Sequence, residues 1–267
     1  MIELKVLQNM VYSIFVEFDR ICRKHNIKYT MEGGTLMGAV KYQDFVPWDD
    51  DIDVVMVRNE YEKFLKIAPM ELNSKFFLQS YNNVSEFPLN YAKLCFNGTE
   101  IYDYDYSHLK NMNHGIFIDI FPVDNVIPKK LKKHCSMVGI FTGARKVKLR
   151  AIKPKGIRKL VYGALSILPM KLLIKLVDKS CKMYNKKDTG YIYEVCNSNR
   201  KFKPLNSEVY KSLVELPFRD KKFFAIENYD DFLKSRFGKN YANELPSEDK
   251  RKPSHNQNIR IVLKEKD

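Results

Sequence analysis

Four aspartates within five positions constrain this chain more than any other stretch of its sequence. An apolar, β-branched run at 54–57, typical of a buried strand, directly follows Asp49, Asp50, Asp51 and Asp53. Because side chains alternate along a strand, we expect Asp51 and Asp53 to project to the same side. Carboxylates this close repel one another unless a cation lies among them. Such oxygen ligands suit a hard divalent cation, so we predict a Mg²⁺ or Mn²⁺ site held by Asp51 and Asp53, with Asp49 assisting.

A Gly-Gly turn lies shortly before the aspartates. Gly33 and Gly34 follow a short predicted strand at 28–32, and Thr35 is expected to cap a helix that runs to about Tyr42. Backbone amides at a helix start face a bound phosphate, so we predict that Gly33, Gly34 and Thr35 bind substrate phosphate. Two simpler interpretations stay open from the residues alone. They are a tight turn without a ligand and a solvated acidic loop without a cation.

Charged residues interrupt two predicted strands further along the chain. Asp119 stands inside an almost entirely apolar segment, 115–124, and burying a lone carboxylate is costly unless it is paired or bound to metal. We therefore predict that Asp119 joins the metal site, either as a ligand or as the acceptor of a proton. Lys93 lies in the predicted strand 91–96, where it either binds a phosphate oxygen or solubilises an edge strand. Asp124 is expected to cap a loop after a turn at Pro122.

Hydrophobic periodicity predicts most of the remaining elements. Apolar residues recur every three or four positions at 3–25, which indicates an amphipathic helix. A second helix is predicted from Arg58 to Ala68, ended by Pro69. Further strands are predicted at 76–79, 100–102 and 191–196, and a last helix at 229–237.

The composition is that of a folded protein whose basic charge lies mainly in one segment. The 267 residues are 45% hydrophobic, which is ample for a core. Five scattered cysteines without a CxxC pair argue against a disulfide framework and a zinc site. The first ten residues have no signal-peptide pattern, so we expect a cytoplasmic location.

The segment from Lys129 to Lys187 carries 18 basic residues and one acid, whereas the rest of the chain has a net charge of −3. It is predicted to be helical, with breaks at Pro154 and Pro169. Its most apolar run, 160–170, is too short to cross a bilayer and is either a core helix or an interfacial one. The concentrated charge favours an anionic partner, such as a membrane surface or a glycan. No helix-turn-helix, finger or RNP motif indicates nucleic acid.

Three motifs occur in an order that resembles the LicD family of phosphotransferases. They are EGGTLMGAV from Glu32, FVPWDDDIDVVM from Phe45 and GIFIDIFPVD from Gly115. The stretch from Tyr241 to His255 resembles the C-terminal family signature more loosely, with Asn256 where members often have a second histidine. The resemblance implies an α/β fold with a mixed sheet of nucleotidyltransferase type, in which a later strand supplies the third acid; Asp119 fits that position.

The resemblance also implies the reaction. It predicts metal-dependent transfer of a phosphorylated alcohol, phosphocholine or glycerol or ribitol phosphate, from a CDP-activated donor to a sugar hydroxyl of a cell-surface glycan precursor, with release of CMP. Residues 1–127 would be the catalytic core, and the basic region 128–267 would complete the substrate site, with peripheral contact to the inner face of the cytoplasmic membrane. The rival hypotheses are a glycosyltransferase that uses a nucleotide sugar and a non-catalytic module that binds anionic glycan.

Overall fold

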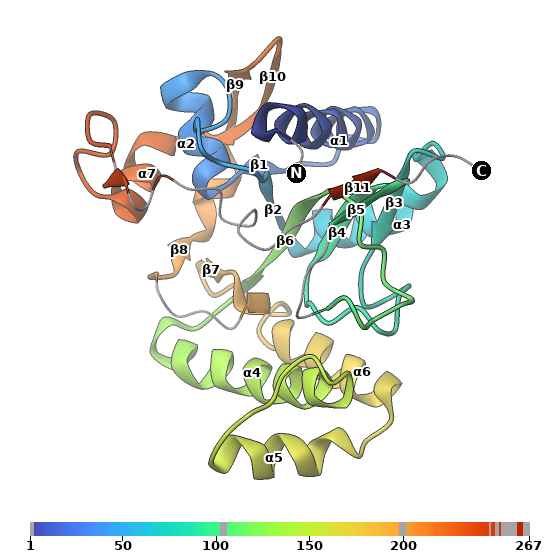
Figure 1. Cartoon of the computed structure of the whole chain (residues 1–267). Coiled ribbons are helices and arrows are strands. Elements are labelled where there is room, and N and C mark those ends of the chain that lie inside the picture. The colour runs from blue at the N-terminus through green and yellow to red at the C-terminus, as the bar shows by residue number, and fades with distance from the viewer. Residues whose placement is uncertain are drawn as a thin grey trace.

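The computed structural model describes residues 3–101, 106–197, 202–245, 247–248, 251 and 261–263. At its centre lies a mixed β-sheet in which β2 (Asp53–Val57) and β6 (Phe117–Asn125) run parallel and side by side. Three antiparallel strands extend this pair: β1 (Thr30–Met31) beside β2, then β4 (Ala92–Phe96) beside β6 and β3 (Phe76–Gln79) beside β4. Helices flank the sheet (Figure 1), so the predicted α/β class is confirmed.

Short strands complete the sheet and its surroundings. At the end of β6, β7 (Tyr191–Tyr193) pairs with Asp124 and Asn125, and β8 (Leu205–Asn206) pairs with β7. The 3₁₀ helices η2 (Val195–Asn197) and η3 (Ser207–Tyr210) follow these two strands. A separate two-stranded sheet joins β5 (Thr99–Ile101) to β11 (Ile261–Leu263). Tyr102, the last residue of the strand predicted at 100–102, lies outside the described residues.

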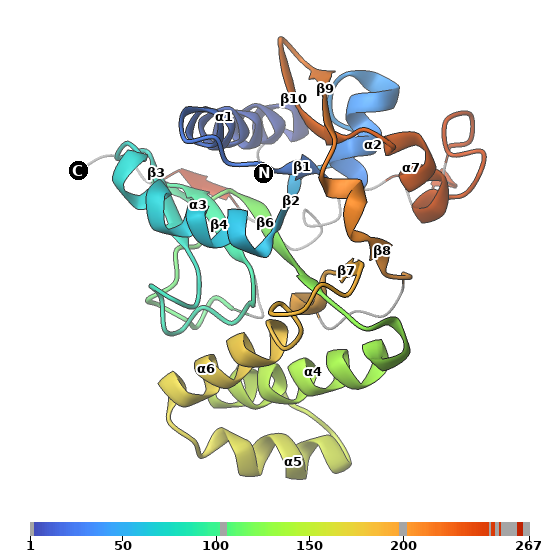
Figure 2. The same cartoon turned by 180° about the vertical axis from the view of Figure 1, so that it is seen from behind.

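Two amphipathic helices cover one face of the sheet. α1 (Leu4–Lys24) buries the apolar side that its periodicity predicts, and α3 (Arg58–Glu71) lies beside it (Figure 2). Val54 and Met56 of β2 and Ile118 and Ile120 of β6 belong to the same buried cluster as these helices. By alternation, Asp53 and Asp119 must then project from the opposite face.

The end of the described chain returns to pack on its beginning. β9 (Leu213–Phe218) and β10 (Lys221–Ile226) form a hairpin whose Phe223 ring stacks on Phe15 of α1, with centroids 4.0 Å apart. The Ile226 N–H donates to Thr30 Oγ1 at 3.0 Å. α7 (Tyr229–Phe237) then contacts α2 (Gly33–Tyr42). Residues beyond 200 therefore contribute to the main core, while the domain boundary at 127/128 stays a prediction.

The basic segment forms a helical layer inserted between β6 and β7. η1 (Pro128–Lys130) leads into α4 (Leu131–Lys148), followed by α5 (Ile157–Ser166) and α6 (Met170–Cys181). The predicted breaks at Pro154 and Pro169 are confirmed. α4 and α6 contribute Cys135, Val138, Val177 and Cys181 to a small second core, which also includes Val126, Tyr193 and Val195.

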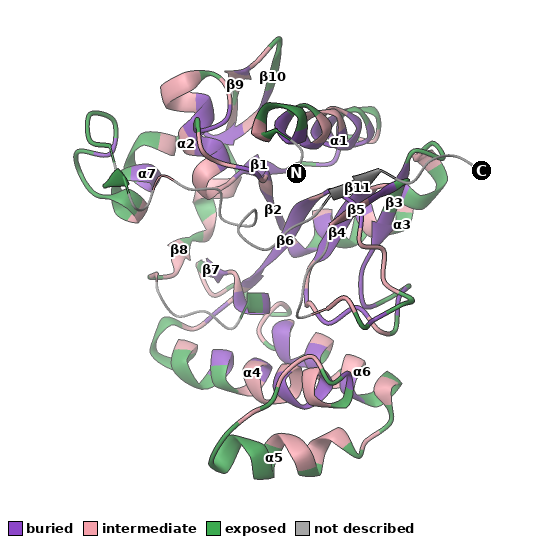
Figure 3. Cartoon of the chain, in the orientation of Figure 1, coloured by how far each residue is buried: buried purple, intermediate pink, exposed green. Residues whose placement is uncertain are grey.

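α5 differs from its two neighbours because it buries none of its residues. It lies on the outer side of α4 and is drawn largely as exposed or intermediate in Figure 3. The apolar run predicted as either a core or an interfacial helix is therefore not a core helix. In the described part of the chain, no single helix has the length and hydropathy to span a membrane; α5 and α6 meet that test only as a pair bent by 118°.

Two local predictions are wrong, each for a physical reason. α3 does not end before Pro69 but continues to Glu71, because a proline in the last turn removes only one hydrogen bond and the Leu72 N–H still bonds to the Ala68 carbonyl at 3.0 Å. β6 likewise runs straight through Pro122. Asp124 does not cap a loop: it is fully buried, and the Arg58 guanidinium donates two hydrogen bonds to its carboxylate at 2.7 and 2.6 Å.

Candidate active site

A row of four charged side chains crosses the sheet at the first residue of β2. The strand register pairs Asp53 with Asp119 of β6, and Asp119 with Lys93 of β4. On the other side of β2, the Glu32 N–H donates to the Asp53 carbonyl at 3.1 Å and continues the register of β1. Residues directly opposite each other on neighbouring strands project to the same face. Glu32, Asp53, Asp119 and Lys93 therefore line the face that α1 and α3 leave uncovered.

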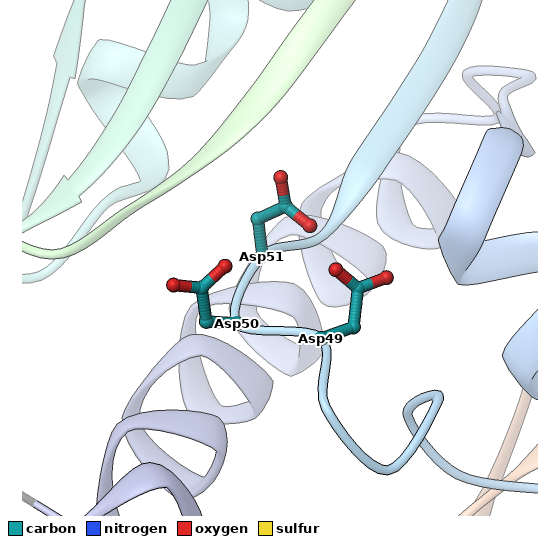
Figure 4. Close-up of side chains that lie close together, drawn as sticks. All are labelled: Asp49, Asp50 and Asp51. Atoms are coloured by element: carbon teal, nitrogen blue, oxygen red, sulfur yellow. The ribbon is translucent and has the colours of Figure 1, made fainter. Parts of the chain in front are cut away.

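The loop before β2 adds three carboxylates to this row. Each of Asp49, Asp50 and Asp51 has a carboxylate oxygen within 4.8 Å of those of the other two. Figure 4 shows the three side chains leaving consecutive positions of the loop, with Asp49 and Asp51 turned toward each other. α1 holds the loop in place, since Gln8 Nε2 donates to the Asp49 carbonyl at 2.9 Å. The structure thus brings Asp49 and Asp51 together as predicted and adds Asp50, which we did not predict as a ligand.

Burial and crowding raise the pKa values of two of these carboxyl groups. Burial, followed by the charges of Asp51 and Asp119, raises the pKa of Asp53 well above its usual range. Burial and the neighbouring Asp51 raise the pKa of Asp49 to about 8. These carboxyls repel one another when ionised, and a divalent cation among them would remove the repulsion. The donor set of clustered carboxylate oxygens fits Mg²⁺ or Mn²⁺, which is the ligand chemistry that the sequence predicts.

The glycine turn lies against both parts of the site. α2 begins at Gly33, which has φ +53°, and a Cβ added there would lie 4.0 Å from Asp53 Oδ2. A Cβ on Gly34 would collide with Asp49 Oδ2. The absence of both side chains leaves the start of α2 open beside the carboxylates, where its free N–H groups favour an anion.

Thr35 is part of this turn but does not cap α2. The helix starts three residues earlier than predicted, because Glu32 is the extended residue whose carbonyl accepts the Leu36 N–H at 3.1 Å. Thr35 Oγ1 instead accepts the Asp53 N–H at 2.9 Å. The residue therefore fastens the first turn of α2 to the start of β2 and fixes the glycine turn relative to Asp53.

Lys93 is buried within the sheet. β4 lies between β6 and β3, so the edge-strand interpretation is wrong. Lys93 Nζ is 3.2 Å from Asp119 Oδ1 and 3.0 Å from the centroid of the Phe117 ring. An ammonium group next to the carboxylate row is suited to bind a phosphate oxygen. This role of Lys93 stays a prediction.

Sequence reasoning missed two acids of this region. Glu32 could have been found by extending the pairing of β1 and β2 by one residue, whereas Glu194, which follows β7, had no local signal. Burial raises the pKa of Glu32 to about 7 and that of Glu194 to about 8. His255, the last residue of the stretch that resembles the C-terminal family signature, lies outside the described residues.

A known family matches the part of the chain that holds most of these residues. The profile of the family described as LicD/FKTN/FKRP, nucleotidyltransferase domain, matches residues 26–154. The chain carries a LicD-family domain. The matched range holds the glycine turn, the aspartate loop, Lys93 and Asp119, whereas Glu194 lies outside it.

Curated relatives cover different shares of this chain. A lipopolysaccharide cholinephosphotransferase of Haemophilus influenzae is 28% identical over 270 aligned residues, which cover 97% of this chain and 98% of the relative. An uncharacterized protein of Rickettsia typhi is 37% identical over 59 residues, or 22% of this chain and 19% of its own length. An uncharacterized protein of Rickettsia prowazekii is 36% identical over 59 residues, covering 22% of each chain.

Proposed function

We propose that this chain transfers phosphocholine from CDP-choline to a sugar hydroxyl of a cell-surface glycan precursor and releases CMP. It is a LicD-type phosphotransferase. One observation carries the proposal: Asp53 and Asp119 are opposed on neighbouring parallel strands, with the Asp49–Asp51 loop and the start of α2 beside them. The full-length similarity to a lipopolysaccharide cholinephosphotransferase supports choline as the alcohol. Glycerol phosphate and ribitol phosphate are the other alcohols that such a donor can carry.

Mg²⁺ or Mn²⁺ would be held by Asp49, Asp51 and Asp53, with Asp119 completing the site. Such an ion, when bound, neutralises the charge that builds on the phosphate oxygens and on the leaving group. The Asp50 carboxylate belongs to the same cluster and can serve as a further ligand.

The residues of the chain have separate tasks in the transfer. The amides of Gly33, Gly34 and Thr35 would orient the donor phosphate, and Lys93 would neutralise one of its oxygens. The acceptor oxygen forms a bond to the phosphorus of phosphocholine while the bond from that phosphorus to the bridging oxygen of CMP breaks. Asp119 would either complete the metal site or accept the proton of the acceptor hydroxyl.

The test is metal-dependent release of CMP. The full chain would be incubated with CDP-choline, CDP-glycerol or CDP-ribitol, a lipopolysaccharide acceptor and Mg²⁺. We expect CMP to form with Mg²⁺ and to disappear when the metal is chelated. No CMP from any of these donors would contradict the proposal, and release of a nucleoside diphosphate from a nucleotide sugar would favour a glycosyltransferase instead.

We further propose that α5 rests on an anionic membrane surface, where lipid-linked acceptors are found. Apolar residues at positions 157, 160, 161 and 164 of α5 follow the helical repeat and form one exposed stripe. Ile157 is 72% exposed, Leu160 69% and Ile167, just beyond the helix, 82%. Lys155, Arg158 and Lys159 are exposed beside them. An apolar helical face flanked by basic residues fits the boundary between anionic head groups and acyl chains.

A further inference from the structure

A cavity opens on the same face of the sheet as the charged row. Its volume is about 110 Å³, and its wall includes Glu32, Val55, Glu194, Phe202, Tyr210 and Arg236. Val55 follows Asp53 by two residues on β2, so it projects from the same face roughly 7 Å further along the strand. The charge of Glu194 acts on Asp53, and that of Asp119 acts on Glu194. The cavity therefore adjoins the place where the donor phosphate is proposed to bind.

The charged groups of this cavity are out of balance. Two of its lining residues, Glu32 and Glu194, are acids, and Arg236 is the basic residue among those that line it in the described chain. Arg236 Nη2 lies 3.7 Å from Glu32 Oε1, whereas Glu194 accepts a hydrogen bond from the neutral side chain of Asn197. The raised pKa values of Glu32 and Glu194 leave both acids partly protonated near neutral pH, and a bound cation would favour their ionised forms, in which the cavity carries one negative charge in excess. A phosphate would be repelled from it, and a monovalent cation would be attracted.

The aromatic wall of the cavity already holds a cation. The Arg236 guanidinium lies 3.9 Å from the centroid of the Phe202 ring, within the range of a cation–π contact. Tyr210 supplies a second ring to the lining. Burial raises the pKa of its hydroxyl well above the usual range, and the nearby charge of Glu32 raises it further. Val55 and other apolar side chains complete the wall. Aromatic rings combined with carboxylates are the surroundings that stabilise a quaternary ammonium group, which has no hydrogen bond to donate.

We infer that this cavity binds the trimethylammonium end of the phosphocholine that is transferred. The inference rests on the proposed function and assigns the alcohol specificity to Glu194, Phe202 and Tyr210. The phosphate would lie at Asp53 and the quaternary nitrogen beside Val55, the next residue of β2 on the same face. The short ethylene spacer of choline would join these two positions.

The test separates charge from shape. Binding to the full chain would be measured by calorimetry for phosphocholine and for dimethylbutyl phosphate, an isostere in which carbon replaces the quaternary nitrogen. We expect phosphocholine to bind at least about tenfold more tightly. Glu194→Gln should remove most of that preference, and Tyr210→Leu should reduce it while Tyr210→Phe keeps it. Glu208→Gln, an exposed charge deletion in η3 outside the cavity, is the matched control and should preserve the preference.

The outcomes separate this inference from the proposed function. Equal binding of the two phosphates, or a loss in Glu194→Gln that is the same for both, would overturn the cavity assignment. CMP release that is equally fast from CDP-choline and CDP-glycerol would also overturn it while leaving transfer from a CDP-alcohol intact. A preference for phosphocholine without CMP release from any CDP-alcohol would support the cavity and reject the transfer.

Discussion

The carboxylate site and the α4–α6 layer concentrate charge in opposite ways. At the site, acids crowd together in a largely buried place, and the pKa values of Asp49 and Asp53 rise as a result. In the helical layer between Lys129 and Lys187, Arg145 is fully buried, but most of the 18 basic residues lie on an outer surface that also exposes apolar side chains. Buried repulsion requires a counterion inside the fold, whereas exposed charge is satisfied by water or by a partner. The carboxylate site therefore indicates a bound cation, whereas the helical layer indicates contact with water or an anionic partner.

The largest effect on CMP release should come from a change at Asp119, the buried acid of β6. Asp119→Asn removes one charge without changing the side-chain volume, and we expect CMP release to fall about a thousandfold. The folded protein should be less stable than before in the absence of metal, because the buried Lys93 ammonium loses its ion pair with the Asp119 carboxylate. Activity assays and thermal unfolding of the same preparation measure both. Full activity in this variant would remove Asp119 from the mechanism.

The glycine turn should come next in size. Gly34→Ala places a Cβ against Asp49 Oδ2 and narrows the space at the start of α2, so affinity for the CDP-alcohol donor should fall about a hundredfold. Gly163→Ala in α5, where an added Cβ meets no atom within 4 Å, is the control and should bind the donor normally. Unchanged donor affinity in Gly34→Ala would show that the turn is only structural.

A smaller effect is expected at the exposed face of α5. Leu160→Asp should weaken binding to anionic vesicles about tenfold, because it puts a charge where an apolar side chain meets the acyl chains. Met70→Asp, at a residue of α3 that is 75% exposed, is the control and should bind as the unaltered chain does. Sedimentation across a salt series should show binding that weakens as salt rises. Equal binding to neutral and anionic vesicles would contradict this use of the basic layer.

The smallest effect concerns the dependence of stability on pH. Glu194 has a folded pKa of about 8 against an ordinary value of 4.5, so the folded state holds this proton more tightly than the unfolded state. Its protonation therefore favours folding, and stability should decline as pH rises from about 4.5 to about 8. Over this pH range, Tm should fall by a few degrees less in Glu194→Gln than in the unaltered chain. An unaltered pH profile in Glu194→Gln would mean that its carboxyl titrates normally.

The position of the acidic cluster can be found in the sequence because its signals are local. The aspartate loop, the β-branched strand after it and the lone acid in an apolar strand are each visible within ten residues. No local pattern fixes the register that opposes Asp53 and Asp119, which only the three-dimensional structure reveals. The expected capping role of Thr35 is wrong because α2 already begins at Gly33. Thr35 Oγ1 accepts the Asp53 N–H instead, which only the three-dimensional contacts reveal.

The cavity could not be predicted because its residues come from distant parts of the chain. Glu32, Glu194 and Arg236 are each unremarkable in their own segments and meet only through the pairing of β7 with β6 and the return of α7 onto α2. The same is true of Arg58 and Asp124, whose buried ion pair joins the start of α3 to β6. Periodicity indicates which side of a helix is apolar, but it does not say whether that side is covered, as α5 demonstrates.

Binding of Mn²⁺ to the full chain without any substrate tests the central claim most directly. The account predicts a saturable site that binds Mn²⁺ in calorimetry or electron paramagnetic resonance and raises Tm. It also predicts that Asp53→Asn weakens this site by at least about tenfold while the variant stays folded, because a ligand charge is lost without a change in volume. Identical Mn²⁺ affinity in the unaltered chain and in Asp53→Asn, or no saturable site in either, would contradict the account.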